Sequence, residues 1–160
     1  MARLILVWLW LSGISDMTAA AEPPADWRQS ADMPQKVDRL VEALPSAANI
    51  MIEMGERYQN LYWAAKQGKW EFAIYQTEEI KELIEKLEIT RPKRAASARE
   101  FLGVVFPLLP EATKTRDWKK FEAAFEQMRR ECMACHVKNE MGFVQLPLPR
   151  RATSPVLNME

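Results

Sequence analysis

Two cysteines and one histidine near the C-terminal end of the chain have the spacing of a covalent cofactor site. Cys132, Cys135 and His136 form the pattern C-x-x-C-H, which is typical of c-type haem attachment. In such a site both thiols become thioethers to the haem vinyl groups, and the adjacent imidazole binds the iron. The sequence therefore predicts one haem c, held covalently through Cys132 and Cys135, with His136 as an axial ligand.

Other uses of these cysteines need residues that the sequence does not supply. A structural zinc site takes four Cys or His ligands, whereas the chain has 2 Cys and 1 His. A thioredoxin-type C-x-x-C lies at the start of a helix, where the helix dipole lowers the thiol pKa; this pair falls near a predicted helix end. Because the only histidine is assigned to iron, a Ser-His-Asp set is excluded, and we do not expect an enzyme.

Composition favours a single helical domain without a nucleic-acid partner. The chain has 160 residues, of which 48% are hydrophobic and only 5 are glycine, which disfavours a turn-rich β fold. Its 22 Lys and Arg residues balance 22 Asp and Glu residues. A neutral chain lacks the basic surface by which proteins bind nucleic acid.

Residues 1–21 have the pattern of a secretory signal peptide. Arg3 provides a positive start, residues 4–11 are apolar, and the small residues 19–21 fit a cleavage site before Glu22. The apolar run is far shorter than the roughly 20 residues that span a bilayer. An N-terminal anchor is the alternative, but we expect cleavage, a mature chain without a membrane span, and the periplasm of a Gram-negative bacterium, where haem attachment follows export.

Helical periodicity predicts four amphipathic helices between residues 46 and 139. Ser46 is a good N-cap for the first helix, and Asp117 is a good N-cap for the fourth. Pro107 and Pro110 should interrupt the third helix. The predicted ranges are 46–66, 69–90, 92–112 and 117–137.

Helices joined by short connections predict an all-α fold, an antiparallel four-helix bundle with covalently attached haem near the end of the last helix. The motif cysteines continue the apolar seam of that helix, so we expect the haem inside the bundle, against Phe125 and Met128. Residues 22–45 are a lead-in with a short helix over 34–44, and residues 140–160 an irregular Pro-rich tail. The tail contains apolar residues that can cover the bundle: Phe143, Val144, Leu146 and Leu148.

The motif, its place in the last helix and the helix count together resemble the class II cytochromes c, the cytochrome c′-like four-helix bundles. The resemblance covers roughly residues 46–137 and includes Cys132, Cys135 and His136. It implies a haem attached in the final helix. Since dimers are common in this group, it also implies that the chain can form a homodimer.

A second iron ligand is expected from the first helix. In an antiparallel bundle the end of the fourth helix lies beside the start of the first, which places Met51 and Met54 opposite His136. The low-spin class II members carry a ligating methionine near that start, and Met51 matches it best; Met54 or a vacant or otherwise filled site are the alternatives. Met141 lies beside the motif and is not expected to reach the opposite face. A looser resemblance to small bacterial monohaem proteins rests on Ile50, Met51, Trp70, Ala73 and Tyr75.

These features predict a periplasmic monohaem electron-transfer protein that works with redox partner proteins. A five-coordinate, cytochrome c′-like protein that binds NO or CO is the alternative. A haem subunit of a larger complex is a third hypothesis.

Overall fold

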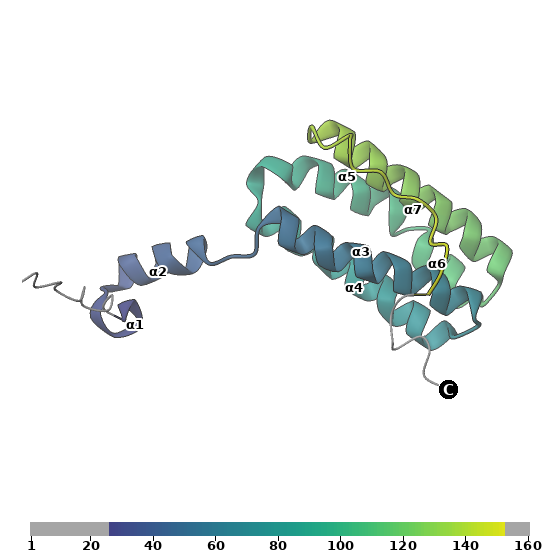
Figure 1. The fold of residues 1–160 in the computed structure, drawn as a ribbon, viewed down its shortest axis with the longest axis horizontal. Helices are drawn as coiled ribbons and strands as arrows, with labels where there is room; N and C mark the ends of the chain where they lie inside the picture. Colours follow the sequence, from purple (N-terminus) through teal and green to yellow (C-terminus); the bar gives the residue numbers. More distant parts are fainter. Residues whose placement is uncertain (1–25, 153–160) are drawn as a thin grey trace, which may run out of the picture. The chain divides into compact units, whose positions relative to one another are not determined.

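The computed structural model describes residues 26–152, in which all regular structure is helical. The chain divides into two compact units, residues 1–42 and 43–160. The described part of the first unit contains α1 (Trp27–Ser30) and α2 (Met33–Glu42) (Figure 1). The short helix predicted over 34–44 is confirmed as α2. The predicted signal peptide, residues 1–21, lies outside the described residues.

The second unit is built from long helices that lie side by side (Figure 1). Its elements are α3 (Ala47–Lys66), α4 (Trp70–Thr90), the 3₁₀ turn η1 (Pro92–Arg94), α5 (Ala95–Val105), α6 (Leu109–Lys114) and α7 (Trp118–Lys138). Helix α4 packs against α3, α5 and α6, and α7 packs against α5 and α6. The contact between α3 and α7 is much smaller. The predicted all-α class is confirmed, and no helix within residues 26–152 has both the length and the apolar character needed to cross a bilayer.

The long helices begin where the sequence places capping residues. The Ser46 hydroxyl accepts a hydrogen bond from the Asn49 backbone N–H (3.1 Å), and the Asn49 side chain accepts one from the Ser46 N–H (3.2 Å). This reciprocal pair satisfies two N–H groups that a helix start leaves unpaired. At the start of α7, the Asp117 carboxylate accepts the Lys120 N–H at 3.0 Å. Both predicted N-caps are therefore confirmed.

Glycine and proline set the other helix boundaries. Gly68, which follows α3, has φ 73°, a left-handed conformation that glycine adopts without strain. The third predicted helix is divided into α5 and α6 around Pro107, as expected. Pro110 lies in the first turn of α6, where its missing N–H would have no helical partner anyway.

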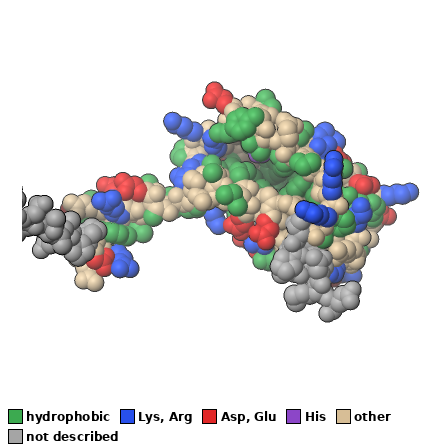
Figure 2. Space-filling model, viewed as in Figure 1, with side chains coloured by type: hydrophobic (Ala, Val, Ile, Leu, Met, Phe, Trp, Pro, Cys, Tyr) green, Lys and Arg blue, Asp and Glu red, His purple; other side chains and the backbone are tan. Residues whose placement is uncertain are grey.

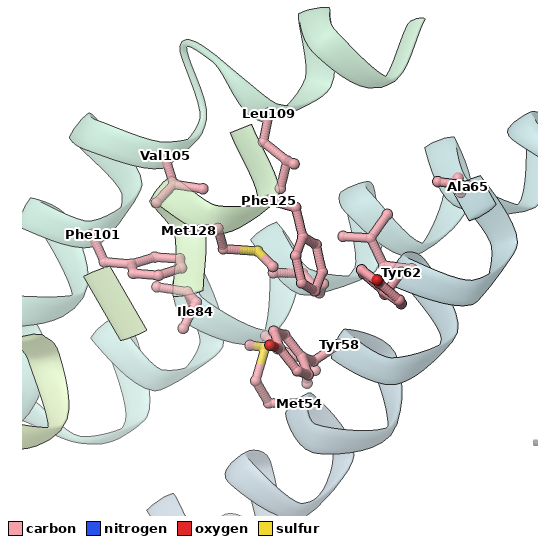
Figure 3. Close-up of a cluster of buried hydrophobic side chains, with 14 of the residues drawn as sticks. Met54, Tyr58, Tyr62, Ala65, Ile84, Phe101, Val105, Leu109, Phe125 and Met128 are labelled. Atoms are coloured by element: carbon pink, nitrogen blue, oxygen red, sulfur yellow. The ribbon is translucent and has the colours of Figure 1, made fainter. Parts of the chain in front are cut away.

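One half of the core is filled by aromatic rings. Phe121 and Phe125 of α7 are 0% exposed. The Phe125 ring stacks on Tyr58 of α3 with centroids 4.8 Å apart, and the facing side chains of these helices are visible in Figure 3. The ring of Phe121 packs against those of Trp70 and Trp118, with centroids 6.1 and 5.8 Å apart. We call this cluster the aromatic half; its members are Tyr58, Tyr62, Trp70, Trp118, Phe121 and Phe125.

Candidate haem-binding site

The other half of the second unit contains a cavity of about 1100 Å³ on the side where α3 and α7 have little contact. A hollow bordered by hydrophobic side chains is visible in the space-filling view (Figure 2). The helices supply walls that are mostly apolar: Met51, Met54, Gly55 and Tyr58 from α3, Ile80, Ile84 and Leu87 from α4, Phe101 from α5, and Met128, Cys132, Cys135 and His136 from α7. Met141 and residues 144–151 also line the cavity.

The three residues of the C-x-x-C-H motif lie together in this wall. Cys132 and Cys135 are one helical turn apart in α7, so both side chains reach the same cavity. Both thiols are free, and burial raises the pKa of Cys132 to about 12. A thiol with that pKa stays protonated at neutral pH, unlike the activated cysteine of a thiol oxidoreductase.

The His136 ring is oriented by a backbone carbonyl of the tail. Its Nδ1 lies 3.2 Å from the Val144 carbonyl oxygen. When Nδ1 carries the proton and donates this bond, Nε2 is left with a free lone pair for a metal. A histidine that binds iron through Nε2 is commonly held in this way by a neighbouring acceptor.

The two candidate methionines both line the cavity from α3. Met54 is buried among the side chains of Figure 3, with 7% of its surface exposed. Met51 is half-buried and packs against the edge of the same core. The structure therefore places both methionines at the same cavity as the motif, and Met51 is the less buried of the two. Met141 also lines the cavity, and its N–H donates to the His136 carbonyl at 2.8 Å, so its backbone lies beside His136.

The cavity and its donor set fit one haem. Haem is a broad apolar disc that needs apolar walls, and its two carboxylates need a polar edge. Apolar atoms dominate the surface of this cavity. Arg94, Arg150 and Arg151 also line it, and arginine is well suited to bind carboxylates. Within residues 26–152 no three His, Cys, Asp or Glu side chains cluster in a way that would hold a bare metal ion.

The tail covers the cavity as its apolar residues predicted, since Val144, Leu146 and Leu148 line it, but the side chains that hold the tail were missed. The Tyr58 hydroxyl donates to the Pro147 carbonyl at 3.1 Å, and Arg129 Nη1 donates to the Leu146 carbonyl at 3.1 Å. Leu146 packs against the core, whereas Phe143 remains 78% exposed. Proximity to the motif was the only available signal, because these bonds end on backbone carbonyls that no sequence pattern marks.

We compared the chain with protein-family models, with curated proteins and with solved structures, and none of the three comparisons gave a match.

Proposed function

We propose that this protein is an exported monohaem c-type cytochrome that transfers electrons to and from redox partner proteins. One observation carries the proposal: Cys132, Cys135 and His136 line the same large apolar cavity as Met51 and Met54. When bound, haem c supplies reversible one-electron chemistry at iron. The proposal includes a four-helix bundle around the haem, a cleaved signal peptide at residues 1–21 and a periplasmic location.

The residues of the site would divide the work of holding the haem. Cys132 and Cys135 would tether it through thioethers, and His136 Nε2 would bind iron while Nδ1 remains bonded to Val144. Met51 would supply the second protein ligand of the iron, with Met54 as the alternative. A thioether ligand favours the ferrous state and raises the reduction potential.

Electron transfer is favoured over catalysis because the site offers no second reactive group. The single histidine would be occupied by iron, and the only two cysteines would both be consumed as thioethers. The apolar walls would keep water from the iron. An iron with two protein ligands can change its oxidation state with little movement of the chain, and we therefore assign no enzymatic reaction.

Gas binding is the second candidate. If neither Met51 nor Met54 bound the iron, His136 would be its one protein ligand, and NO or CO could bind in the remaining space of the cavity. Spectra of the ferric and ferrous protein separate the two functions: a low-spin spectrum supports electron transfer, and a high-spin spectrum with rapid CO binding supports a gas-binding protein.

The decisive experiment is mass spectrometry of the protein exported from cells competent in cytochrome maturation, together with a pyridine haemochrome assay. We expect the mass of one haem above that of the chain that begins at Glu22. A variant with Cys132→Ser and Cys135→Ser should be exported and cleaved but should lack the added mass. A wild-type mass equal to that of the bare polypeptide would refute the proposal.

A further inference from the structure

Residues 141–149, which we call the strap, are held to the cavity by their backbone rather than by a packed helix face. Three successive regions of the strap accept hydrogen bonds through main-chain carbonyls. The Val144 carbonyl oxygen lies 3.2 Å from His136 Nδ1 and accepts a hydrogen bond when that nitrogen carries the proton. The Leu146 carbonyl accepts from Arg129 and the Pro147 carbonyl from Tyr58, each at 3.1 Å. The strap therefore depends on three specific side chains from the helices.

These side chains come from both helices that border the open side of the bundle. Tyr58 belongs to α3, whereas Arg129 and His136 belong to α7. Because α3 and α7 have little direct contact, the strap connects them across the cavity. Residues of the strap also line that cavity, including Val144, Leu146 and Pro147.

Tyr58 and Arg129, which we call the anchors, are both held in a state that can donate a hydrogen bond. Burial raises the pKa of Tyr58 well above its usual value, so the phenol keeps its proton. Arg129 is itself oriented by an ion pair with Glu126, with 2.9 Å between Nε and the carboxylate oxygen. Both side chains of this pair are about a quarter exposed, which limits competition from water for the guanidinium.

The strap and the histidine are also tied through the main chain. The Met141 N–H donates to the His136 carbonyl at 2.8 Å, and the Val144 N–H donates to the Met141 carbonyl at 2.9 Å. This turn brings the Val144 carbonyl back to the ring of His136. The turn holds the Val144 carbonyl from its N-terminal side, and the bonds to Leu146 and Pro147 hold the chain two and three residues further on.

We propose that Tyr58 and Arg129 are positioning residues: they dock the strap so that the Val144 carbonyl holds the Nδ1 proton of His136 and directs Nε2 into the cavity. The role of Nε2 as an iron ligand rests on the proposed function. Docking of the strap does not depend on the proposed function, because all of the hydrogen bonds that hold the strap are made between groups of this chain.

The test follows the Nδ1 proton of the only histidine by NMR in the exported, haem-loaded protein. Removing both anchors with Tyr58→Phe and Arg129→Met should accelerate exchange of this proton with water by roughly tenfold or more, because each hydrogen bond lost is worth on the order of a factor of five in an opening equilibrium. The single variant Arg129→Lys, which keeps Tyr58 and a cation at position 129, should exchange slowly, as the wild type does. Unchanged exchange in the double variant would overturn the proposal.

Matched controls separate positioning from general loss of stability. Arg130→Met alters the neighbouring residue of α7, whose guanidinium bonds Gln127 instead of the strap, and Tyr75→Phe alters an exposed tyrosine of α4. Both should leave the exchange rate unchanged.

The outcome can be distinguished from failure of the proposed function. If the exported protein carries no haem, the ¹⁵N shifts of the His136 ring report the tautomer directly. We then expect the Nδ1–H form in the wild-type chain and a shift toward Nε2–H in the double variant. Identical tautomer populations in the two chains would overturn the role of the strap, whereas haem content alone decides the proposed function.

Discussion

The two halves of the second unit use the same helices for different purposes. In the aromatic half, rings from α3, α4 and α7 fill the interior, and Phe121 and Phe125 are completely buried. In the cavity half, the same α3 and α7 surround a space of about 1100 Å³. Helix α7 passes from one half to the other between Phe125 and Cys132. The comparison shows that the apolar face of one helix, α7, can be covered by packed side chains along one part of its length and border an open cavity along the next.

Side-chain size explains the difference. Large rings project from α3 in the aromatic half, at Tyr58 and Tyr62, whereas the residues of α3 before Tyr58 that line the cavity are smaller or unbranched, including Ala47, Ala48, Met51 and Gly55. Interiors of folded proteins are normally close-packed. A cavity of this size with apolar walls is therefore the feature of the fold that most needs an occupant.

The largest expected effect distinguishes the packing of the two halves. Phe121→Ala should lower the free energy of unfolding by about 3–5 kcal/mol, because it opens a new cavity among closely packed rings. Met54→Ala should cost about 2 kcal/mol, the low end for such a truncation, because it enlarges an existing space. Urea unfolding in a Cys132→Ser, Cys135→Ser background compares polypeptide packing alone. Equal losses would mean that the cavity half is as tightly packed as the aromatic half.

The second prediction concerns the wall of the cavity. Met51→Ala in the haem-loaded protein should convert a low-spin ferric spectrum to a high-spin one, remove the near-infrared sulfur-to-iron band and lower the reduction potential. Met54→Ala is the matched control and should keep the band. The reverse result would assign the ligand to Met54, and a wild-type protein without the band would show that neither residue binds iron.

A smaller effect is expected at the helix start beside the cavity. Ser46→Ala removes one half of the reciprocal cap with Asn49 and should cost about 1 kcal/mol of unfolding free energy. The loss should be the same at all pH values near neutrality, since neither side chain titrates there. Thermal or urea unfolding measures it, and Ser46→Asp should retain most of the stability. A loss that varied with pH would point to an effect beyond the cap.

The cap in the aromatic half should behave differently because it is a carboxylate. The hydrogen bond from the Lys120 N–H lowers the pKa of Asp117 in the folded state. Its contribution to stability is therefore complete above the unfolded-state pKa of about 4, and it is lost as the pH falls through the lower folded-state value. Asp117→Asn should be less stable than the wild type at neutral pH, and the difference should shrink in acid. A constant difference from pH 7 to pH 2 would contradict this assignment.

Helix positions were predictable because their signals are local. Ser46 and Asp117 are capping residues directly before apolar periodic segments, and both helices begin there. Gly68 and Pro107 act through the conformations that they allow or forbid. The placement of Met51 and the C-x-x-C-H motif on one cavity followed from helical spacing and antiparallel order, which need no knowledge of packing details.

The strap was not predictable for a physical reason. The apolar residues Val144, Leu146 and Leu148 alternate in the sequence and indicate that the segment covers an apolar surface, but nothing in this short pattern indicates which surface that is. Their position is fixed by hydrogen bonds from Tyr58 and Arg129 to carbonyl oxygens, which every residue possesses. Tyr58 resembles an ordinary core residue, and Arg129 resembles an ordinary surface charge. Only the three-dimensional arrangement reveals that both hold the same segment.

The order of the strap in the polypeptide has a consequence for maturation. A chain that is synthesised and translocated from its N-terminus presents Cys132, Cys135 and His136 before the residues that fold back beside them. If the proposed haem is attached after export, the motif would be accessible until the strap folds back. The strap would then close by its hydrogen bonds to Tyr58 and Arg129 together with the apolar contact of Leu146.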